Sequence, residues 1–217
     1  MKGLLKKDLY QMRAYAGVMI LAGVIMMGVS VVMVGEGNNF FMLYAGFLMG
    51  MLPMTLQAYD QNSRFNQYST ALPVTKGQLV GCKYLIGLGM MLLAELLAVL
   101  VLGAAALRGS AVSREMVFIT LMQLMGVTLL SNAIMLPLTY RLGFEKAKYV
   151  YYLCIGLIAA WMGFGVATSE DGVPSSGMDL LPEGVSLLVP LGVALVGLAL
   201  YAASWRLSVA WYGKAEA

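Results

Sequence analysis

The chain has 217 residues, of which 60% are hydrophobic and 12% are charged, and its formal net charge is +3. This balance excludes an ordinary water-soluble globular domain and predicts an integral membrane protein. The chain has no histidine, so the commonest general base and the usual zinc ligand are missing and most hydrolase mechanisms are excluded.

Residues 1–13 come before the first long apolar stretch and are rich in lysine. Leu5, Leu9 and Met12 are spaced i, i+4 and i+7, so they share one face of a helix, while most of the basic residues lie around the other face. This pattern predicts a short amphipathic helix that lies on the inner membrane surface. The alternative is a disordered basic tail.

Six apolar stretches are long enough to cross a bilayer, because about 20 helical residues span a hydrocarbon core of about 30 Å. Their interiors carry no charge except for Glu95 in the third stretch. The predicted spans are 14–35, 38–59, 83–107, 116–140, 149–168 and 185–206. The predicted fold is therefore an all-α membrane protein with six transmembrane helices.

The basic residues predict the orientation of these spans. All but two of the 14 Lys and Arg residues fall in segments that lie in the cytoplasm if the N-terminus does, and the exceptions are Arg108 and Arg114. Short cytoplasmic loops are enriched in Lys and Arg. We therefore expect both termini, including the tail 207–217, to lie in the cytoplasm and the acidic loop 169–184 to lie outside.

Polar side chains inside the spans are candidates for a substrate path. Glu95 lies near the middle of the third span, where an ionised carboxylate is costly unless it is paired, protonated or hydrated. Two interpretations stay open: a wall of a substrate cavity, or a protonated carboxyl group that bonds to a neighbouring helix. Thr55, Gln57 and Asn132 would likewise either line a path or bond between helices.

Gly46 and Gly50 form a Gly-x-x-x-Gly pair in the second predicted span. Such a pair lets two helices approach closely, and it could support dimerisation in a membrane. Because the chain holds 25 glycines, chance matches are common and the pair by itself is a weak signal.

The connection 60–82 between the second and third spans is long and much less apolar than its flanks. It begins with Asp60, contains Leu-Pro-Val-Thr-Lys at 72–76 and is closed by Lys-Tyr at 83–84. Together with the opening Met-Lys-Gly-Leu-Leu-Lys-Lys-Asp-Leu-Tyr at 1–10, this pattern resembles ABC transporter permeases of the type-2, exporter class, and within it the small six-span permeases.

In that family the connection forms a coupling helix, which rests in a cleft of a separate ATP-hydrolysing subunit. The residues that would couple to the ATPase here are Asp60, Arg64, Phe65, Tyr68 and Leu72, of which the first four are spaced i, i+4, i+5 and i+8 on one helical face. Pro73 is predicted to end that helix. Thr75 is predicted to cap the third span, and Lys83 to extend its ammonium towards the membrane surface. An ordinary solvated loop is the alternative.

The resemblance implies a permease subunit of an ATP-driven exporter in the bacterial cytoplasmic membrane. Its expected partners are two copies of an ABC ATPase, a second permease chain that is identical or related, and the lipid bilayer, but no nucleic acid. The chain has no phosphate-binding loop, so we expect the ATPase to bind ATP and Mg²⁺ and this chain to hold no cofactor or metal. Hydrophobic or amphipathic substrates are expected, most of all peptides. The alternative is a non-transporting accessory or immunity protein that binds a toxin or another partner.

Overall fold

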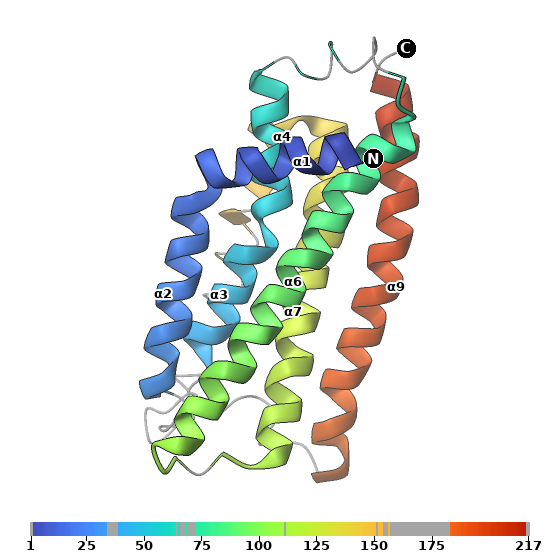
Figure 1. Ribbon diagram of the computed structural model, residues 1–217. Coiled ribbons are helices and arrows are strands. Elements are labelled where there is room, and N and C mark those ends of the chain that lie inside the picture. Colours follow the sequence, from blue (N-terminus) through green and yellow to red (C-terminus); the bar gives the residue numbers. More distant parts are fainter. Residues whose placement is uncertain are drawn as a thin grey trace.

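The computed structural model describes residues 2–33, 39–63, 65, 68, 73–110, 112–150, 152–153, 156 and 183–215. All regular structure within these residues is helical, so the all-α prediction is confirmed for the described part of the chain. The long helices run side by side, and the N-terminal helix crosses one end of the bundle (Figure 1).

The chain enters the bundle through a sharp bend. Helix α1 (Lys2–Gln11) is followed by a turn of π-helix, Met12–Ala16, and then by α2 (Gly17–Met33). The two α-helices are inclined to each other by 69°. As a result α1 lies across the end of the bundle while α2 runs along it (Figure 1).

The inward face of α1 differs from the predicted apolar face. Asp8 and Met12 are buried, whereas Leu9 is 59% exposed. The predicted helix is present, but Asp8 points into the protein, where it forms an ion pair with a residue of opposite charge.

The second apolar stretch forms two consecutive helices, α3 (Phe40–Gly50) and α4 (Leu52–Asn62), which are separated by a turn at Met51. Pro53 stands in the first turn of α4, where its missing N–H costs least. Helix α4 thus continues three residues beyond the predicted span 38–59, and the bounds of that span stay a prediction.

Helix α6 (Lys76–Leu107) begins well before the predicted boundary at 83. Its start is set by Thr75, whose Oγ1 accepts a hydrogen bond from the Gln78 N–H at 3.3 Å, while Gln78 Oε1 accepts one from the Thr75 N–H at 3.2 Å. This reciprocal capping box fixes the first turn. The predicted cap is thus confirmed. The helix begins seven residues before the predicted span 83–107, and the bounds of that span stay a prediction.

Helix α7 (Arg114–Leu142) extends two residues beyond each end of the predicted span 116–140. It ends at Gly143, whose φ of +78° is a backbone conformation that suits glycine. The chain then turns, and residues 144–150 are helical. The last helix, α9 (Glu183–Ala215), contains the predicted span 185–206.

Four described helical segments are long and apolar enough to cross a membrane: Phe40–Asn62, Lys76–Leu107, Arg114–Leu142 and Leu188–Tyr212. The bent pair of α1 and α2 makes a fifth if it is counted as one span. The predicted fifth span, 149–168, lies mostly outside the described residues, as does the loop 169–184. The number of six spans and their orientation therefore stay predictions.

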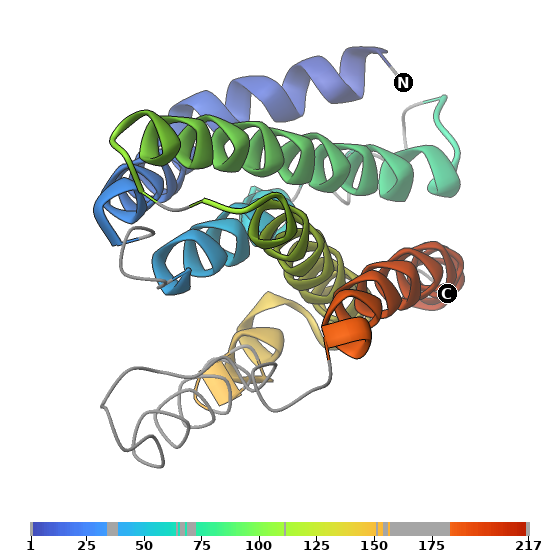
Figure 2. The ribbon, with the colours of Figure 1, turned by 90° about the horizontal axis from the view of Figure 1, so that it is seen from below.

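The helices differ in how deeply they are buried. In the most apolar window of each, 67% of the α3–α4 segment is buried but only 28% of α9. Helix α7 packs against α3 on one side and α9 on the other, as the end-on view shows (Figure 2). The α3–α4 segment is therefore central, and α9 presents a large apolar surface of the kind that lipid covers.

The Gly-x-x-x-Gly pair makes its close contact inside the chain. A Cβ atom at Gly46 would lie 2.1 Å from Leu124 Cδ1, and one at Gly50 would lie 2.7 Å from Ser131 Oγ. Both neighbours belong to α7, so the two glycines let α3 approach α7. The face that the sequence suggested for dimerisation is thus occupied by another helix of the same chain.

Candidate functional site at the charged end of the bundle

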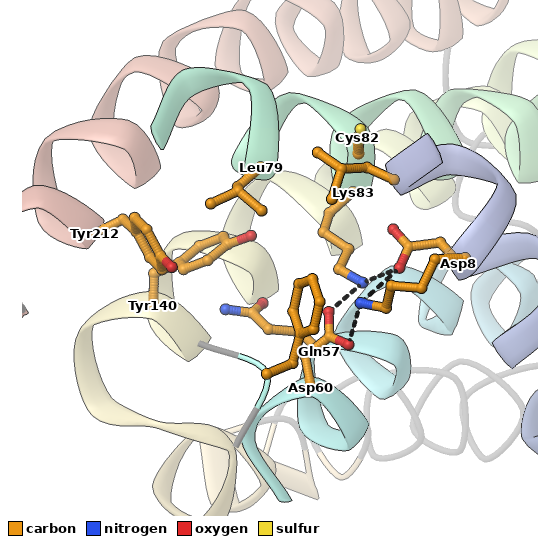
Figure 3. Close-up of a pocket in the computed structure, with 11 residues that line it drawn as sticks. Asp8, Gln57, Asp60, Leu79, Cys82, Lys83, Tyr140 and Tyr212 are labelled. Atoms are coloured by element: carbon orange, nitrogen blue, oxygen red, sulfur yellow. Dashed lines mark hydrogen bonds and ion pairs between the residues drawn. The ribbon is translucent and has the colours of Figure 1, made fainter. Parts of the chain in front are cut away.

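Four charged side chains meet where α1 crosses α4 and α6 (Figure 3). Lys83 Nζ lies 2.8 Å from Asp8 Oδ1 and 2.7 Å from Asp60 Oδ2. Lys7 Nζ lies 2.5 Å from Asp60 Oδ1 and 3.2 Å from Asp8 Oδ1. Each ammonium group thus contacts both carboxylates, so the charges alternate and cancel. We call these four residues the ion ring, and the end of the bundle that holds them the charged end.

The ion ring is largely removed from solvent. The side chains of Asp8, Asp60 and Lys83 are 4%, 6% and 6% exposed, and that of Lys7 is 26% exposed. Removing an ion from water costs several kcal/mol, and the cost is offset only by well-placed opposite charges and hydrogen bonds. These side chains can be buried together because their charges alternate, so that each ion lies next to ions of opposite charge.

The ring brackets the segment 63–75, which we call the loop segment. Asp60 stands in the last turn of α4, immediately before this segment, and Lys83 stands about two turns into α6, after it. Two further contacts strengthen the attachment to α1: Gln11 Nε2 donates to Asp60 Oδ1 at 3.1 Å, and the Lys7 ammonium lies 3.6 Å from the centroid of the Phe65 ring. The second contact is a cation–π interaction.

The end of α4 is also attached to the helical segment 144–150. Gln61 Oε1 accepts a hydrogen bond from the backbone N–H of Phe144 at 3.0 Å. The first N–H groups of a helix have no partner within the helix, so this side chain satisfies one of them. The start of the loop segment is thereby attached to α1, α6 and the 144–150 segment.

A small cavity of about 20 Å³ lies beside the ion ring (Figure 3). This volume holds about one water molecule. Gln57, which is 3% exposed, lines the cavity, and its Oε1 atom has no hydrogen-bond partner among the described residues. The cavity is lined by charged, aromatic and aliphatic side chains, which are Leu4, Lys7, Asp8, Gln57, Asp60, Phe65, Leu79, Cys82, Lys83, Tyr140 and Tyr212.

A second polar network begins at the next residue of α6. The Tyr84 hydroxyl lies 2.6 Å from Ser204 Oγ and 2.8 Å from Ser208 Oγ, both on α9. The Tyr201 hydroxyl donates to the backbone carbonyl of Tyr84 at 2.6 Å. We call Tyr84, Tyr201, Ser204 and Ser208 the hydroxyl seam, because they join α6 to α9 without any charge.

The hydroxyl seam also satisfies a carbonyl that a proline leaves without a partner. Pro137 lies inside α7 and has no N–H, so the carbonyl oxygen of Ala133, four residues earlier, has no helical donor. Ser204 Oγ donates to that oxygen at 2.7 Å. The bond joins α9 to α7 where a transmembrane helix would otherwise expose an unpaired carbonyl.

The structure divides the predicted ATPase-coupling residues between two environments. Asp60 is buried in the ion ring, and it therefore does not share an exposed face with Tyr68, which is 64% exposed. Phe65 is partly buried and contacts Lys7. Arg64 and Leu72 lie outside the described residues. Their coupling role stays a prediction, with Asp60 turned inward.

The predicted substrate-path residues do not gather in one place. Asn132 is 2% exposed and donates to the Thr128 carbonyl on its own helix, and Thr55 donates to the Met51 carbonyl. Glu95 Oε1 is buried and has no hydrogen-bond partner within the part of the chain that the structure describes. Of the four, Gln57 alone lines the cavity beside the ion ring.

Sequence reasoning missed Lys7, Asp8 and Lys83 as members of a site. Lys83 was predicted to extend towards the membrane surface, but it is 4% exposed and lies between two carboxylates. A signal was present: Asp8 and Asp60 are isolated acidic residues in segments that are otherwise basic. An isolated acid among lysines at a span end indicates an ion pair.

The described residues offer no site for a metal ion, since no three acidic, cysteine or histidine side chains among them lie close enough to bind one. What the charged end provides is a set of attachments between helices. Such a set is suited to passing movement from the loop segment to the bundle.

Comparison with known proteins adds one match. The sequence model of a family described as "ABC-2 family transporter protein" matches residues 3–213. No curated protein and no solved structure matches the chain. The matched range includes every residue of the ion ring and of the hydroxyl seam.

Proposed function

The chain belongs to the ABC-2 family of transporter proteins, and on that premise we propose that it is the permease subunit of an ATP-driven exporter. It moves hydrophobic or amphipathic substrates, with peptides as the favoured class, out of the cell. Two permease chains, identical or related, form the path, and two ABC ATPase subunits bind ATP and Mg²⁺. The charged end faces the cytoplasm, where Lys and Arg concentrate.

The attachment of the loop segment is the observation that supports coupling to an ATPase. Asp60 and Lys83, which flank the segment, contact each other directly at 2.7 Å. Both residues belong to helices that pack together, α4 and α6. A partner that moves the loop segment therefore moves these two helices with it, rather than bending a free loop.

The exposed aromatic side chain at Tyr68 supports a contact with the partner. Tyr68 is 64% exposed, and the centroid of its ring lies 6.3 Å from that of Phe65. The Phe65 ring in turn contacts the Lys7 ammonium. Aromatic residues and arginine are enriched among the residues that contribute most to binding at protein interfaces. We therefore propose Tyr68 and Arg64 as the residues that bind the ATPase. Phe65 contacts Lys7 of α1 and so attaches the segment to the permease.

The test is the ATPase activity of a reconstituted complex. The chain is co-expressed with its ABC ATPase, and hydrolysis of Mg·ATP is measured in liposomes with and without the chain. We expect Arg64→Ala and Tyr68→Ala each to reduce the chain-dependent part of the activity at least about tenfold, since an interface anchor contributes about 2 kcal/mol. Tyr149→Ala is the matched control, because Tyr149 is 65% exposed and we expect no change there.

Two results would contradict the proposal. One is a chain that neither co-purifies with an ABC ATPase nor alters its activity, as expected of an accessory or immunity protein. The other is chemical labelling of a cysteine at position 64 from outside the cell only. The first result would remove the partner on which the proposal depends, and the second would place the loop segment beyond the reach of a cytoplasmic ATPase.

A further inference from the structure

Glu95 is the single charged residue between Lys83 and Arg108 in the sequence, and it lies in α6, which runs the length of the bundle (Figure 1). Lys83 and Arg108 are about 18 Å and about 20 Å away from it along the helix axis. Glu95 therefore lies midway along the apolar part of α6. At this depth a carboxyl group is far from the water on both sides of a membrane.

The carboxyl group of Glu95 does not join the described helices to one another. Its Oε1 atom is buried, and no described residue forms a hydrogen bond with it. On α7 the hydroxyls of Thr128 and Ser131 and the amide of Asn132 each donate to a backbone carbonyl of their own helix. A carboxyl group that joined two helices would have a polar partner on the second helix. The contacts therefore favour the other interpretation of Glu95, a wall of a substrate path.

The chain itself holds no cation at the depth of Glu95. No Lys or Arg stands in the interior of any of the six apolar stretches, which is a property of the whole sequence. A second, identical copy of the chain lacks such a cation for the same reason. Any cation that pairs with this carboxyl group inside the membrane therefore comes from a different molecule.

The surface beside Glu95 is apolar and open in the described part of the chain. Leu92, Leu96 and Val99 are 62%, 58% and 51% exposed. Leu92 and Val99 are three and four residues from Glu95, a spacing at which side chains of a helix are neighbours. The carboxyl group thus stands at the edge of an apolar strip. Such a surface is complementary to a molecule that carries a positive charge next to an apolar part.

We propose that Glu95 is a binding site for the cationic group of an amphipathic substrate. An ammonium or guanidinium group donates hydrogen bonds, so it satisfies the buried Oε1 atom while its charge neutralises the carboxylate. The apolar part of the substrate lies along Leu92, Leu96 and Val99. The inference rests on the proposed function, since it narrows the substrates of the exporter to amphiphiles with a basic group, such as amphipathic peptides that contain lysine or arginine.

The first test measures binding by the chain alone in phosphatidylcholine nanodiscs, by isothermal titration calorimetry with the signal of empty nanodiscs subtracted. The probe is dodecylguanidinium, which joins a cationic donor group to an apolar chain, and dodecanol is its neutral counterpart. We expect Glu95→Gln to weaken the binding of dodecylguanidinium at least about tenfold, because a desolvated charge pair is lost. The response to dodecanol should be the same in both proteins. Equal affinity of the wild type and Glu95→Gln for dodecylguanidinium, or no binding by the wild type, would overturn the inference.

Glu115→Gln is the matched control. Glu115 is exposed in the first turn of α7, so the substitution removes the same charge from the same chain at the end of a helix. We expect dodecylguanidinium to bind this variant like the wild type. An equally large loss of affinity would mean that the net charge of the chain attracts the probe, and would overturn the inference.

A stability measurement separates a binding role of Glu95 from a structural one. Because none of the described residues bonds to Glu95 Oε1, Glu95→Leu removes a buried polar atom without breaking a hydrogen bond to it. We expect this variant to be at least as stable as the wild type in equilibrium unfolding in mixed SDS micelles, and to lose the binding of dodecylguanidinium. Unfolding at a lower SDS fraction than the wild type, or failure to fold, would show that the carboxyl group holds the bundle together and would overturn the inference.

The complex with the ABC ATPase tests whether the site takes part in transport. In liposomes we expect dodecylguanidinium to raise the chain-dependent hydrolysis of Mg·ATP with the wild type and to have no effect with Glu95→Gln. Equal stimulation of the two proteins would overturn the role of Glu95 and leave the proposed function intact. A chain that binds the probe through Glu95 but never alters the ATPase would contradict the proposed function and leave the binding site intact.

Discussion

The ion ring and the hydroxyl seam are two polar networks that start at adjacent residues of α6 and connect it to different helices. Lys83 reaches α1 and α4, whereas Tyr84 reaches α9. Adjacent side chains of a helix point about 100° apart, so one turn of α6 is held on two sides. The ring joins α6 to the segment that would meet a partner, and the seam joins it to the lipid-facing side of the bundle.

The two networks differ in what a missing member leaves behind. Removing a hydroxyl from the seam leaves a neutral group without a partner, which costs about 1–3 kcal/mol when buried. Removing one member of the ring leaves an uncompensated buried charge, which costs about 3–5 kcal/mol. The seam thus tolerates loss, whereas the ring depends on all of its members.

Replacing Lys83 by methionine should have the largest effect. The substitution keeps the length of the side chain but leaves Asp8 and Asp60 facing a single ammonium group, so we expect about 3–5 kcal/mol of destabilisation. Equilibrium unfolding in mixed SDS micelles measures it. The Asp8→Asn/Lys83→Met double variant should be less destabilised than Lys83→Met alone, and additive losses would contradict the idea of a neutral ring.

Replacing Ser204 by alanine should have an intermediate effect. It removes the donor to the Ala133 carbonyl and a partner of the Tyr84 hydroxyl, for a loss of about 1–3 kcal/mol. Pro137→Ala restores an N–H to α7, so in that background the same substitution should cost less. A double-mutant cycle in the same micelles checks this. An equal loss of unfolding free energy in both backgrounds would mean that Ser204 does not stabilise the protein through its hydrogen bond to the Ala133 carbonyl.

Neutralising the exposed Glu145–Lys148 pair should have the smallest effect, with no resolvable change in the free energy of unfolding. The Glu145 side chain is 78% exposed and that of Lys148 is 30% exposed, so the pair is far better hydrated than the ion ring. The same unfolding measurement provides the comparison. A loss as large as that of Lys83→Met would mean that burial does not set the difference between the ion ring and other ion pairs.

Local spacing predicted the parts of this fold that local chemistry decides. The apolar stretches are helical where they are described, and Thr75 caps α6 because its hydroxyl and Gln78 are three residues apart. The same spacing could not name partners. Gly46 and Gly50 predict a close contact between helices, but any helix surface of matching shape can make it. In this structure the contact is with α7.

The candidate site was predicted only in part for the same reason. Asp60 stood out as an acid at a span end, and the resemblance placed it in a coupling surface. Its true neighbours come from α1 and α6, and Asp8 and Lys83 are 75 residues apart. Such a pairing follows from how helices cross, which the distribution of charges along the chain does not encode. Pro137 is a parallel case, since the sequence shows the proline but not the serine on α9 that compensates it.

Because its four charges cancel, the ion ring has a consequence for the energetics of transport. The membrane voltage acts on net charge, at about 2.3 kcal/mol per elementary charge for each 100 mV crossed. A displacement that carries the whole ring therefore does no electrical work, and the resting potential neither drives nor opposes it. The ring itself therefore adds no voltage dependence to a movement in which it takes part as a whole.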